Sequence, residues 1–497
     1  MGGDRAMSLL PDDCRVAIVG AGLAGLTLAR ELALAGVRPT VVLEAGPGKD
    51  LRHKNALPEG ASMRLWHAAA SDPYFVREWT SSRPPHYDRG SGYRQRVGGR
   101  SLYWHGVCLP LEDDVLHDKV WPRSVVSALG VDPGKGLYAE VQLRLEDWLG
   151  EPLDSCRGSV EEALLNTLYA HGYESVRPVP QAARAHPQTG SWIPYSPVEH
   201  WMEPRGSLLP VVYPNCRVLE VGETRSGRAW LKISDGGQDR VLKADRVFLA
   251  AGTLPTSRLA GQAVMRQTGS DTCELVGLND HIVQGFMAVV PRQVLKLPRK
   301  SGRALCFMPK TGYATSNLFL DVADSADPDR VLLTAWTMGE QLNSKTAVRL
   351  RREPGAVPEI DVQFSEHDCM VVRIQTQQLG ELAVRLFDAE LCDADFVMAD
   401  SDFTSGTPAY YPARLRAGAH RSSDIRFFPY VYPLGSVDHE AGTLGLGALT
   451  DESGAMRCLP SVHGAGPALF PRSGAANPSL TTMALATWQA RETARAL

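Results

Sequence analysis

A glycine-rich turn near the N-terminus has the residue types that could bind a nucleotide. Gly20, Gly22 and Gly25 form a GxGxxG pattern. The first glycine permits a tight turn, the second lets the backbone approach a diphosphate, and the third lets a helix and a strand pack closely. Glu44 follows nineteen residues after Gly25, where a carboxylate can accept hydrogen bonds from ribose hydroxyls. These residues predict a dinucleotide site, and they do not by themselves distinguish FAD from NAD.

The elements that would position this turn occur in the expected order. Residues 15–19 are a short apolar run rich in β-branched residues, which predicts a buried strand. We expect a helix from about 22 to 35, and a second strand over 40–43 that delivers Glu44. Backbone N–H groups at the start of the helix would face the phosphate charge. Strand, turn, helix, strand and acid together predict a βαβ nucleotide-binding unit.

Two further apolar runs indicate that the nucleotide domain is assembled from separated segments. Residues 246–252 predict another buried strand, which ends in a glycine, and residues 216–221 predict a neighbouring strand. Both runs lie far along the chain from the glycine turn. The domain should therefore be built from pieces that are distant in sequence.

Five segments carry recurring glycine, histidine and proline patterns. They are 97–106 (VGGRSLYWHG), 251–259 (AGTLPTSRL), 276–281 (VGLNDH), 439–447 (HEAGTLGLG) and 470–486 (FPRSGAANPSLTTMALA). The last one fits the pattern FPxxxxxNPxxTxxALA almost position for position. Taken together and in this order, the segments resemble the signature motifs of the glucose–methanol–choline (GMC) oxidoreductase family.

The resemblance implies an α/β fold with two domains. One is an FAD-binding domain of Rossmann type built from discontinuous segments, and the other is an α+β substrate domain with an antiparallel sheet. We expect the FAD-binding domain to comprise residues 12–118, 205–290 and 430–497, and the substrate domain to comprise 119–204 and 291–429.

The resemblance also assigns residues to catalysis and to the cofactor. His439 matches the catalytic histidine of the family, and Asn477 matches its partner, which is His or Asn in different branches. The residues that should contact FAD are Gly20, Gly22, Leu23, Ala24, Gly25, Glu44, Gly99, Ser101, Val218, Gly252 and Pro478.

Three residues in the segment 97–106 bear on the class of substrate and on how the flavin is attached to the protein. Trp104 stands where many members of the family have Asn. A tryptophan at this position resembles the pyranose oxidases and the sugar dehydrogenases. The resemblance therefore favours a sugar, glycoside or polyol-like substrate. Tyr103 stands where pyranose oxidases have the histidine that bonds covalently to the flavin. We therefore expect non-covalent FAD, with the neighbouring His105 as the alternative tether.

Oxidation of an alcohol to a carbonyl explains why such residues would be needed. The reaction removes a hydroxyl proton and a hydride, and an oxidised flavin can accept the hydride whereas no side chain would. A histidine can take the proton near neutral pH, and a second donor can hold the substrate oxygen. We expect an FAD-dependent alcohol oxidase or dehydrogenase, with His439 as base and Asn477 as orienting donor. Its partners would be an alcohol and dioxygen or another electron acceptor.

Three other classes of function stay open at this stage. A flavin monooxygenase or amine oxidase would share only the βαβ unit, and a monooxygenase would need NAD(P)H. A protein like the hydroxynitrile lyases would keep the fold and its histidine without redox chemistry. An escort or binding protein would keep the nucleotide fold alone, and the intact pair of His439 and Asn477 argues against it.

Composition narrows the partners and the compartment. The net charge is −4 and the arginines are scattered, so no nucleic-acid partner is indicated. Nine cysteines contain no CxxC pair, which fits a reducing cytoplasm better than a disulfide-built fold, and no metal site is expected. Because no signal peptide and no run of about 18 apolar residues is visible, we expect a soluble cytoplasmic protein.

Overall fold

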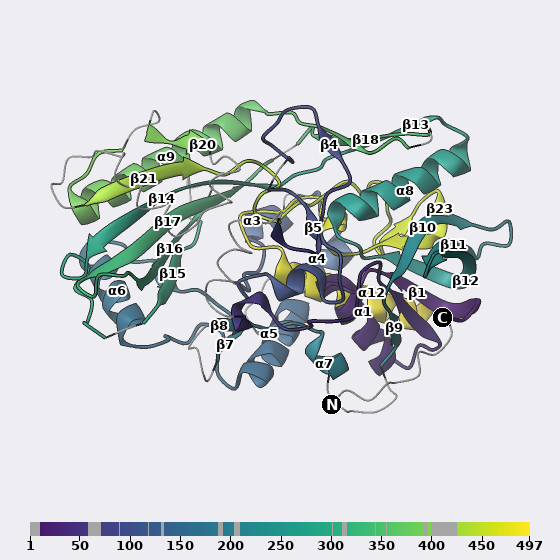
Figure 1. The fold of residues 1–497 in the computed structure, drawn as a ribbon, viewed down its shortest axis with the longest axis horizontal. Coiled ribbons are helices and arrows are strands. Elements are labelled where there is room, and N and C mark those ends of the chain that lie inside the picture. Colours follow the sequence, from purple (N-terminus) through teal and green to yellow (C-terminus); the bar gives the residue numbers. More distant parts are fainter. Residues whose placement is uncertain are drawn as a thin grey trace.

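The fold is organised around two large sheets toward opposite ends of its long axis (Figure 1). The computed structural model of the chain describes residues 10–57, 71–88, 90–117, 119–130, 134–186, 192–202, 209–300, 302–310, 316–342, 344–353, 355–391, 395–398 and 425–497.

The first sheet is mainly parallel and draws its strands from three distant stretches of the chain. Its order is β10–β11–β12–β1–β2–β9, with β23 beside β12 and β22 beside β23. The bounds are β1 (Asp13–Val19), β2 (Thr40–Leu43), β9 (Val211–Tyr213), β10 (Cys216–Glu223), β11 (Ala229–Asp235), β12 (Gln238–Leu249), β22 (Ala455–Met456) and β23 (Leu459–Gly464). The strands expected over 15–19, 40–43, 216–221 and 246–252 are all in this sheet, so the assembly from separated segments is confirmed.

Two helices with small buried residues pack side by side against this sheet. They are α1 (Leu23–Leu34) and α12 (Ser479–Ala496). Ala29 on α1 and Ala486 and Ala490 on α12 are almost fully buried in the same cluster as Ile18 of β1. Because alanine carries only a methyl group, the two helix backbones can approach closely, and both helices are held against the nucleotide-binding end of the sheet.

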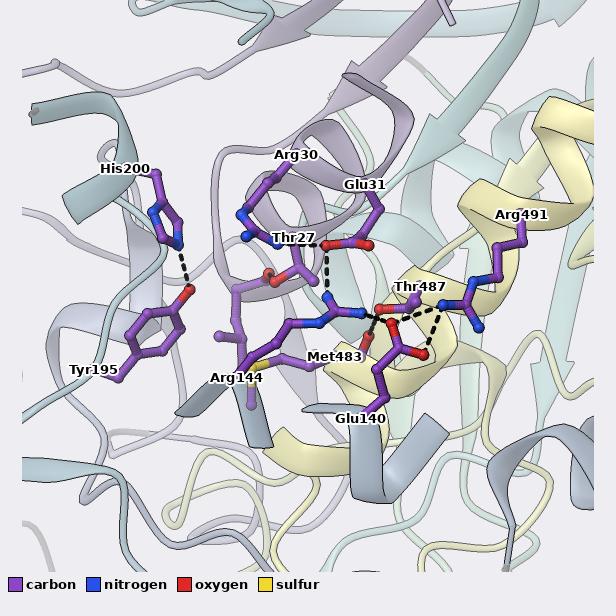
Figure 2. A network of polar contacts seen from close by, with 11 residues as sticks. Thr27, Arg30, Glu31, Glu140, Arg144, Tyr195, His200, Met483, Thr487 and Arg491 are labelled. Atoms are coloured by element: carbon purple, nitrogen blue, oxygen red, sulfur yellow. Dashed lines mark hydrogen bonds and ion pairs between the residues drawn. The ribbon is translucent and has the colours of Figure 1, made fainter. Parts of the chain in front are cut away.

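A chain of ion pairs ties α1 and α12 to α5 (Gly136–Leu149), as Figure 2 shows. Arg144 of α5 binds Glu31 of α1 with a nitrogen–oxygen distance of 2.6 Å, and it also binds Glu140. Glu140 in turn pairs with Arg491 of α12 at 2.6 Å. These side chains are partly exposed, so each pair contributes only about 0–1 kcal/mol, and the network mainly fixes how the three helices are aligned.

The second sheet is antiparallel apart from one edge pair. Its order is β20–β21–β14–β17–β16–β15–β6. The bounds are β6 (Arg177–Pro178), β14 (His281–Pro291), β15 (Ala304–Met308), β16 (Ser316–Asp324), β17 (Arg330–Glu340), β20 (Val397–Met398) and β21 (Arg426–Val431). The antiparallel substrate-domain sheet implied by the family resemblance is therefore present.

The two faces of the second sheet have different roles. Helix α9 (Glu366–Phe387), which starts with a capping box between Ser365 and Asp368, covers one face. On the other face, His281 at the start of β14 lies opposite Glu340 at the end of β17. Directly opposite residues in an antiparallel pair project from the same face. This face therefore presents His281 and Glu340 toward the nucleotide-binding half of the molecule.

The other helices and strands lie around these two sheets. Helix α8 (Thr253–Thr268) follows β12, and a small sheet of β13 (Thr272–Val276), β18 (Ala347–Arg351), β19 (Glu359–Asp361) and β4 (Thr80–Ser81) lies beside it. The remaining elements are η1 (Lys54–Ala56), β3 (Phe75–Val76), β5 (Tyr93–Arg94), η3 (Gly99–Leu102), α3 (Asp113–Leu116), α4 (Arg123–Leu129), α6 (Ser159–Ala170), β7 (Ala183–Ala185), β8 (Trp192–Pro194), α7 (Glu199–Met202) and η5 (Gly466–Leu469).

Two placements bear on the expected domain boundaries, which stay a prediction. Strand β14 begins inside the segment 205–290 that was expected in the FAD-binding domain, yet it is a strand of the second sheet. Helix α5, in the segment 119–204 expected in the substrate domain, packs against α12. Within the described residues, no helix combines the length and the apolar character needed to cross a membrane.

Candidate active site

A large cavity opens at the end of the first sheet where its parallel strands finish. Its volume is about 1740 Å³ including the open mouth. Every predicted cofactor residue except Gly25 lines it, and so do His439 and Asn477. The carboxyl ends of parallel strands are where α/β folds bind ligands, because the following turns and helix N-termini gather there.

The three glycines of the turn do different work. Gly20 has a φ of +106°, and a Cβ there would lie 2.5 Å from the carbonyl oxygen of Ala250. A Cβ on Gly25 would lie 1.9 Å from the carbonyl oxygen of Gly20. At Gly22, by contrast, a Cβ would meet nothing within 4 Å. Gly20 and Gly25 are therefore needed for packing within the protein, whereas Gly22 borders the open space that a diphosphate would fill.

Three helices begin at this cavity. Gly22, Gly252 and Pro478 are the N-cap residues of α1, α8 and α12, and all three line the cavity. None of the three has a side chain that caps the first turn. The first N–H groups of a helix are not used within the helix, and they carry a partial positive charge. The cavity therefore suits a ligand with phosphate oxygens and other acceptors.

Glu44 closes the nucleotide end of the cavity. One carboxylate oxygen accepts a hydrogen bond from the N–H of Ala21 and the other from the N–H of Gly46, each at 2.9 Å. The side chain is buried, and burial raises the pKa of Glu44 to about 7 against the lowering effect of its backbone donors. Each carboxylate oxygen can accept a further hydrogen bond, so the residue can also receive ribose hydroxyls.

Gly99 and Ser101 belong to η3, which passes close to the glycine turn. The N–H of Gly98 donates to the carbonyl oxygen of Ala21 at 2.7 Å. The hydroxyl of Ser101 is used within the protein, because it lies 2.7 Å from both the Gly98 carbonyl oxygen and the Ser196 hydroxyl. The hydroxyl proton of Ser101 is therefore used within the protein, and the backbone of this segment supplies the donors that remain for a cofactor. Val218 also lines the cavity, beside an irregularity in the pairing of β10 with β11.

His439 and Asn477 meet in the wall of the same cavity. The Nδ2 atom of Asn477 lies 3.4 Å from Nε2 of His439. The Oδ1 atom of Asn477 is buried and has no hydrogen-bond partner among the described residues. The structure thus brings together the two residues that the sequence placed 38 positions apart, and it leaves a polar amide beside the imidazole.

A second histidine, for which the sequence analysis proposed no role, lies behind the first. Nδ1 of His281 lies 2.8 Å from Nδ1 of His439, and Nε2 of His281 lies 2.9 Å from the carbonyl oxygen of Gly474. The two rings are nearly perpendicular, at 88°. His281 ends the VGLNDH segment, so the signal that could have pointed to it was present in the sequence.

Arg100 is another residue that the sequence analysis missed, and it anchors both neighbours of His439. Its guanidinium makes two hydrogen bonds to the carboxylate of Glu440, at 2.6 and 3.0 Å, and pairs with Asp438 at 3.1 Å. Asp438 has a φ of +62°, in the left-handed region. A non-glycine residue rarely holds that conformation unless its surroundings fix it. The ion pairs to η3 supply this constraint, and they orient His439.

Both histidines are neutral at physiological pH. Burial lowers the pKa of His281 to about 4. The pKa of His439 is well below its ordinary value, because of burial first, then His281, Arg100 and His105. A neutral imidazole has one nitrogen lone pair available to accept a proton. The site therefore holds a base that does not have to lose a proton before it can act.

Trp104 and its neighbours form another part of the cavity wall. The indole N–H of Trp104 donates to the carbonyl oxygen of Tyr195 at 2.7 Å, and the carbonyl oxygen of Trp104 lies 3.0 Å from Nε2 of His53. The Tyr103 hydroxyl accepts from Arg96 at 3.1 Å. Tyr103, Trp104 and His105 all line the cavity. The indole N–H of Trp104 is thus used within the protein and is not available to a ligand of the cavity.

Comparison with known proteins identifies the ligand of the nucleotide end. Residues 13–69 match the family model described as an FAD binding domain. The cofactor is FAD. This confirms the FAD that the family resemblance implied, at the dinucleotide site predicted from the glycine turn. The open space beside Gly22 and the uncapped helix N-termini fit a dinucleotide of that kind.

Solved structures show the same architecture. Pyridoxine 4-oxidase from Mesorbium loti aligns with a TM-score of 0.63 and 16% sequence identity, over 96% of this chain and 99% of that chain. At this identity the likeness establishes the fold, and it confirms the predicted combination of a Rossmann-type FAD domain with a substrate domain. No curated protein matches the sequence significantly.

Proposed function

We propose that this chain is an FAD-dependent oxidoreductase of GMC type that oxidises a CH–OH group to a carbonyl. The observation that carries the proposal is the position of His439 beside Asn477, in the wall of the cavity that Gly22 and Glu44 also line. The structural likeness to pyridoxine 4-oxidase, by its name an oxidase, also supports it.

The residues of the chain divide the chemistry between them. FAD, when bound, supplies the acceptor for the hydride that leaves the alcohol carbon. His439 accepts the hydroxyl proton, since it is neutral and lies in the cavity wall. The amide N–H of Asn477 donates to the substrate oxygen and orients the carbon that loses its hydride. Tyr103 and Trp104 line the same cavity and supply aromatic surface beside the bound substrate.

Helix α12 contributes an electrostatic effect at the same place. It begins at Ser479, directly after Asn477 and Pro478, and these residues line the cavity. The positive end of its dipole faces the region where the reaction leaves negative charge. Arg491, near its other end, is held in the ion-pair network of Figure 2. The helix is therefore fixed at both ends while its N-terminus serves the site.

Two classes of substrate fit the proposed activity. The ring of Trp104 in the cavity wall supports a sugar, glycoside or polyol-like metabolite. The likeness to pyridoxine 4-oxidase supports a hydroxymethyl group on an aromatic ring. Either ring could stack on an indole, so only a direct assay separates them.

The test is anaerobic mixing of the FAD-loaded protein with D-glucose, an alkyl glucoside, benzyl alcohol and pyridoxine. The proposal predicts that at least one class of alcohol bleaches the oxidised flavin band without any nicotinamide. His439→Ala should keep its FAD and lose this reduction by about 10²–10⁴-fold. Bleaching only after NADPH is added would replace the proposal with a monooxygenase. Unchanged reduction in His439→Ala would remove His439 from the role of base.

A further inference from the structure

The hydrogen bonds behind His439 determine which nitrogen of His281 carries a proton. The carbonyl oxygen of Gly474 can only accept a hydrogen bond, and it lies 2.9 Å from Nε2 of His281. The proton in this contact must therefore sit on Nε2 of His281. His281 as a whole is 2% exposed, so bulk water has little access to this contact.

The proton of His439 is placed by its contact with His281. A neutral His281 with its proton on Nε2 has a lone pair on Nδ1, which can only accept. The contact of 2.8 Å between the two Nδ1 atoms then needs a proton from Nδ1 of His439. In a neutral imidazole this leaves Nε2 of His439 without a proton. That atom lies 3.4 Å from Nδ2 of Asn477, an amide N–H donor, as a lone pair requires.

The turn that carries the Gly474 carbonyl is itself fixed by the second sheet. The N–H groups of Ser473 and Gly474 both donate to Oε1 of Glu340, at 3.0 Å. Glu340 lies opposite His281 in the pairing of β14 with β17. Glu340, which accepts hydrogen bonds from the turn, and His281, which donates to the carbonyl oxygen of Gly474 in that turn, are therefore neighbours on one face of the sheet.

We propose that His281 is a positioning residue that, with the Gly474 carbonyl, holds His439 in the tautomer whose Nε2 is unprotonated and faces Asn477. The proposal rests on the proposed function, because it explains how His439 is ready to accept the proton of an alcohol. When His439 takes that proton at Nε2, its Nδ1–H still donates to His281, so the hydrogen bond persists through the step. The opposite tautomer would present an N–H to the alcohol and could not act as a base.

Two substitutions of His281 separate this role from a purely structural one. The side-chain amide of asparagine lies near the position of Nδ1 of histidine, and that of glutamine near Nε2. His281→Asn therefore keeps an acceptor for Nδ1–H of His439 and loses the Gly474 contact. His281→Gln keeps a donor to Gly474 and loses that acceptor. The exposed His117 offers a matched surface control as His117→Gln.

The experiment measures the tautomer directly and needs no substrate. Full-length protein loaded with FAD is isotope-labelled at its histidine nitrogens, and proton–nitrogen correlation spectra assign His439 by the loss of its signals in His439→Gln. We expect wild type, His117→Gln and His281→Asn to show His439 protonated at Nδ1. His281→Gln should lose that signature and gain a protonated Nε2.

Two results would overturn the inference. One is a protonated Nε2 of His439 in the wild-type protein, which decides the question even if a variant does not fold. The other is an unchanged His439 signature in a folded His281→Gln protein that retains FAD. Neither depends on turnover, so a failure of the inference is distinct from a failure of the proposed function, which would appear as no alcohol reducing the flavin.

Discussion

Substitution of Gly22 gives the sharpest prediction from the nucleotide end of the cavity. Gly22 has φ −88° and ψ −163°, extended backbone that any residue adopts, and a Cβ there would meet no protein atom within 4 Å. Gly22→Val should therefore lower the stability of the FAD-free protein by no more than about 1 kcal/mol, because valine is a poorer N-cap residue than glycine but meets no clash at Cβ. Its side chain fills the space that the diphosphate needs, so FAD binding should be lost.

The magnitude follows from ligand linkage. Wild-type protein at a free FAD concentration 100 times its Kd should gain about 2.7 kcal/mol, and Gly22→Val should gain none. Gly25→Ala is the contrasting variant, because its Cβ would lie 1.9 Å from the Gly20 carbonyl oxygen. That clash requires the backbone to move, which typically costs about 1–3 kcal/mol, and it should destabilise the FAD-free protein itself.

Thermal unfolding of the three proteins, with and without added FAD, measures both effects, and a fluorescence titration of FAD gives the affinity. Wild type should respond to FAD, Gly22→Val should unfold near the wild-type temperature and not respond, and Gly25→Ala should unfold early even without FAD. The reasoning fails if Gly22→Val binds FAD within threefold of wild type. It also fails if the FAD-free Gly22→Val protein is as unstable as Gly25→Ala.

Three further predictions follow from the same cavity. Asn477→Ala should lower the rate constant of flavin reduction by an alcohol about 10²-fold while FAD stays bound, since one donor to the developing oxyanion is lost; stopped-flow absorbance measures it. Arg100→Met should destabilise the protein by about 3–5 kcal/mol in denaturant titrations, because it leaves the buried Glu440 carboxylate unpaired; a loss below 1 kcal/mol would contradict this. Folding raises the pKa of Glu44 from 4.5 to about 7. The contribution of Glu44 to the stability of the folded state is therefore fully present below pH 4.5, and it is lost as the pH rises through 7. In the FAD-free protein, the stability of wild type relative to Glu44→Gln should therefore fall by about 3 kcal/mol between pH 4.5 and 8, and parallel pH profiles would refute the assignment.

Local patterns in the sequence predicted the nucleotide-binding unit well, since its signals lie within a few residues of each other. The apolar run before Gly20 became β1, the stretch expected as helix from about 22 to 35 became α1 over Leu23–Leu34, and the strand over 40–43 has those bounds. The periodicity of apolar residues and the positions of glycines are properties of short segments, so they predict local structure without knowledge of the rest of the fold. The spacing to Glu44 needed nothing beyond this unit.

The site residues divide according to how far their partners lie along the chain. Family-like motifs pointed to His439 and Asn477, and the structure brings both into one cavity. His281 and Arg100 stood inside quoted motifs, but no role could be assigned, because each acts on a segment more than 150 residues away. Their partners become visible only when β14 and η3 are brought against the segment that carries His439.

The sequence by itself determined the chemistry that is available: a glycine turn with a matching acid for a dinucleotide, and a histidine with an amide partner for proton transfer. The tertiary structure decided how those groups are set. It separated Gly22, which faces open space, from Gly20 and Gly25, which pack against backbone. It also placed a carbonyl, a buried histidine and His439 in one line of hydrogen bonds. The physical reason is that residue types are local, whereas the proton position on an imidazole depends on neighbours that only the packed sheets supply.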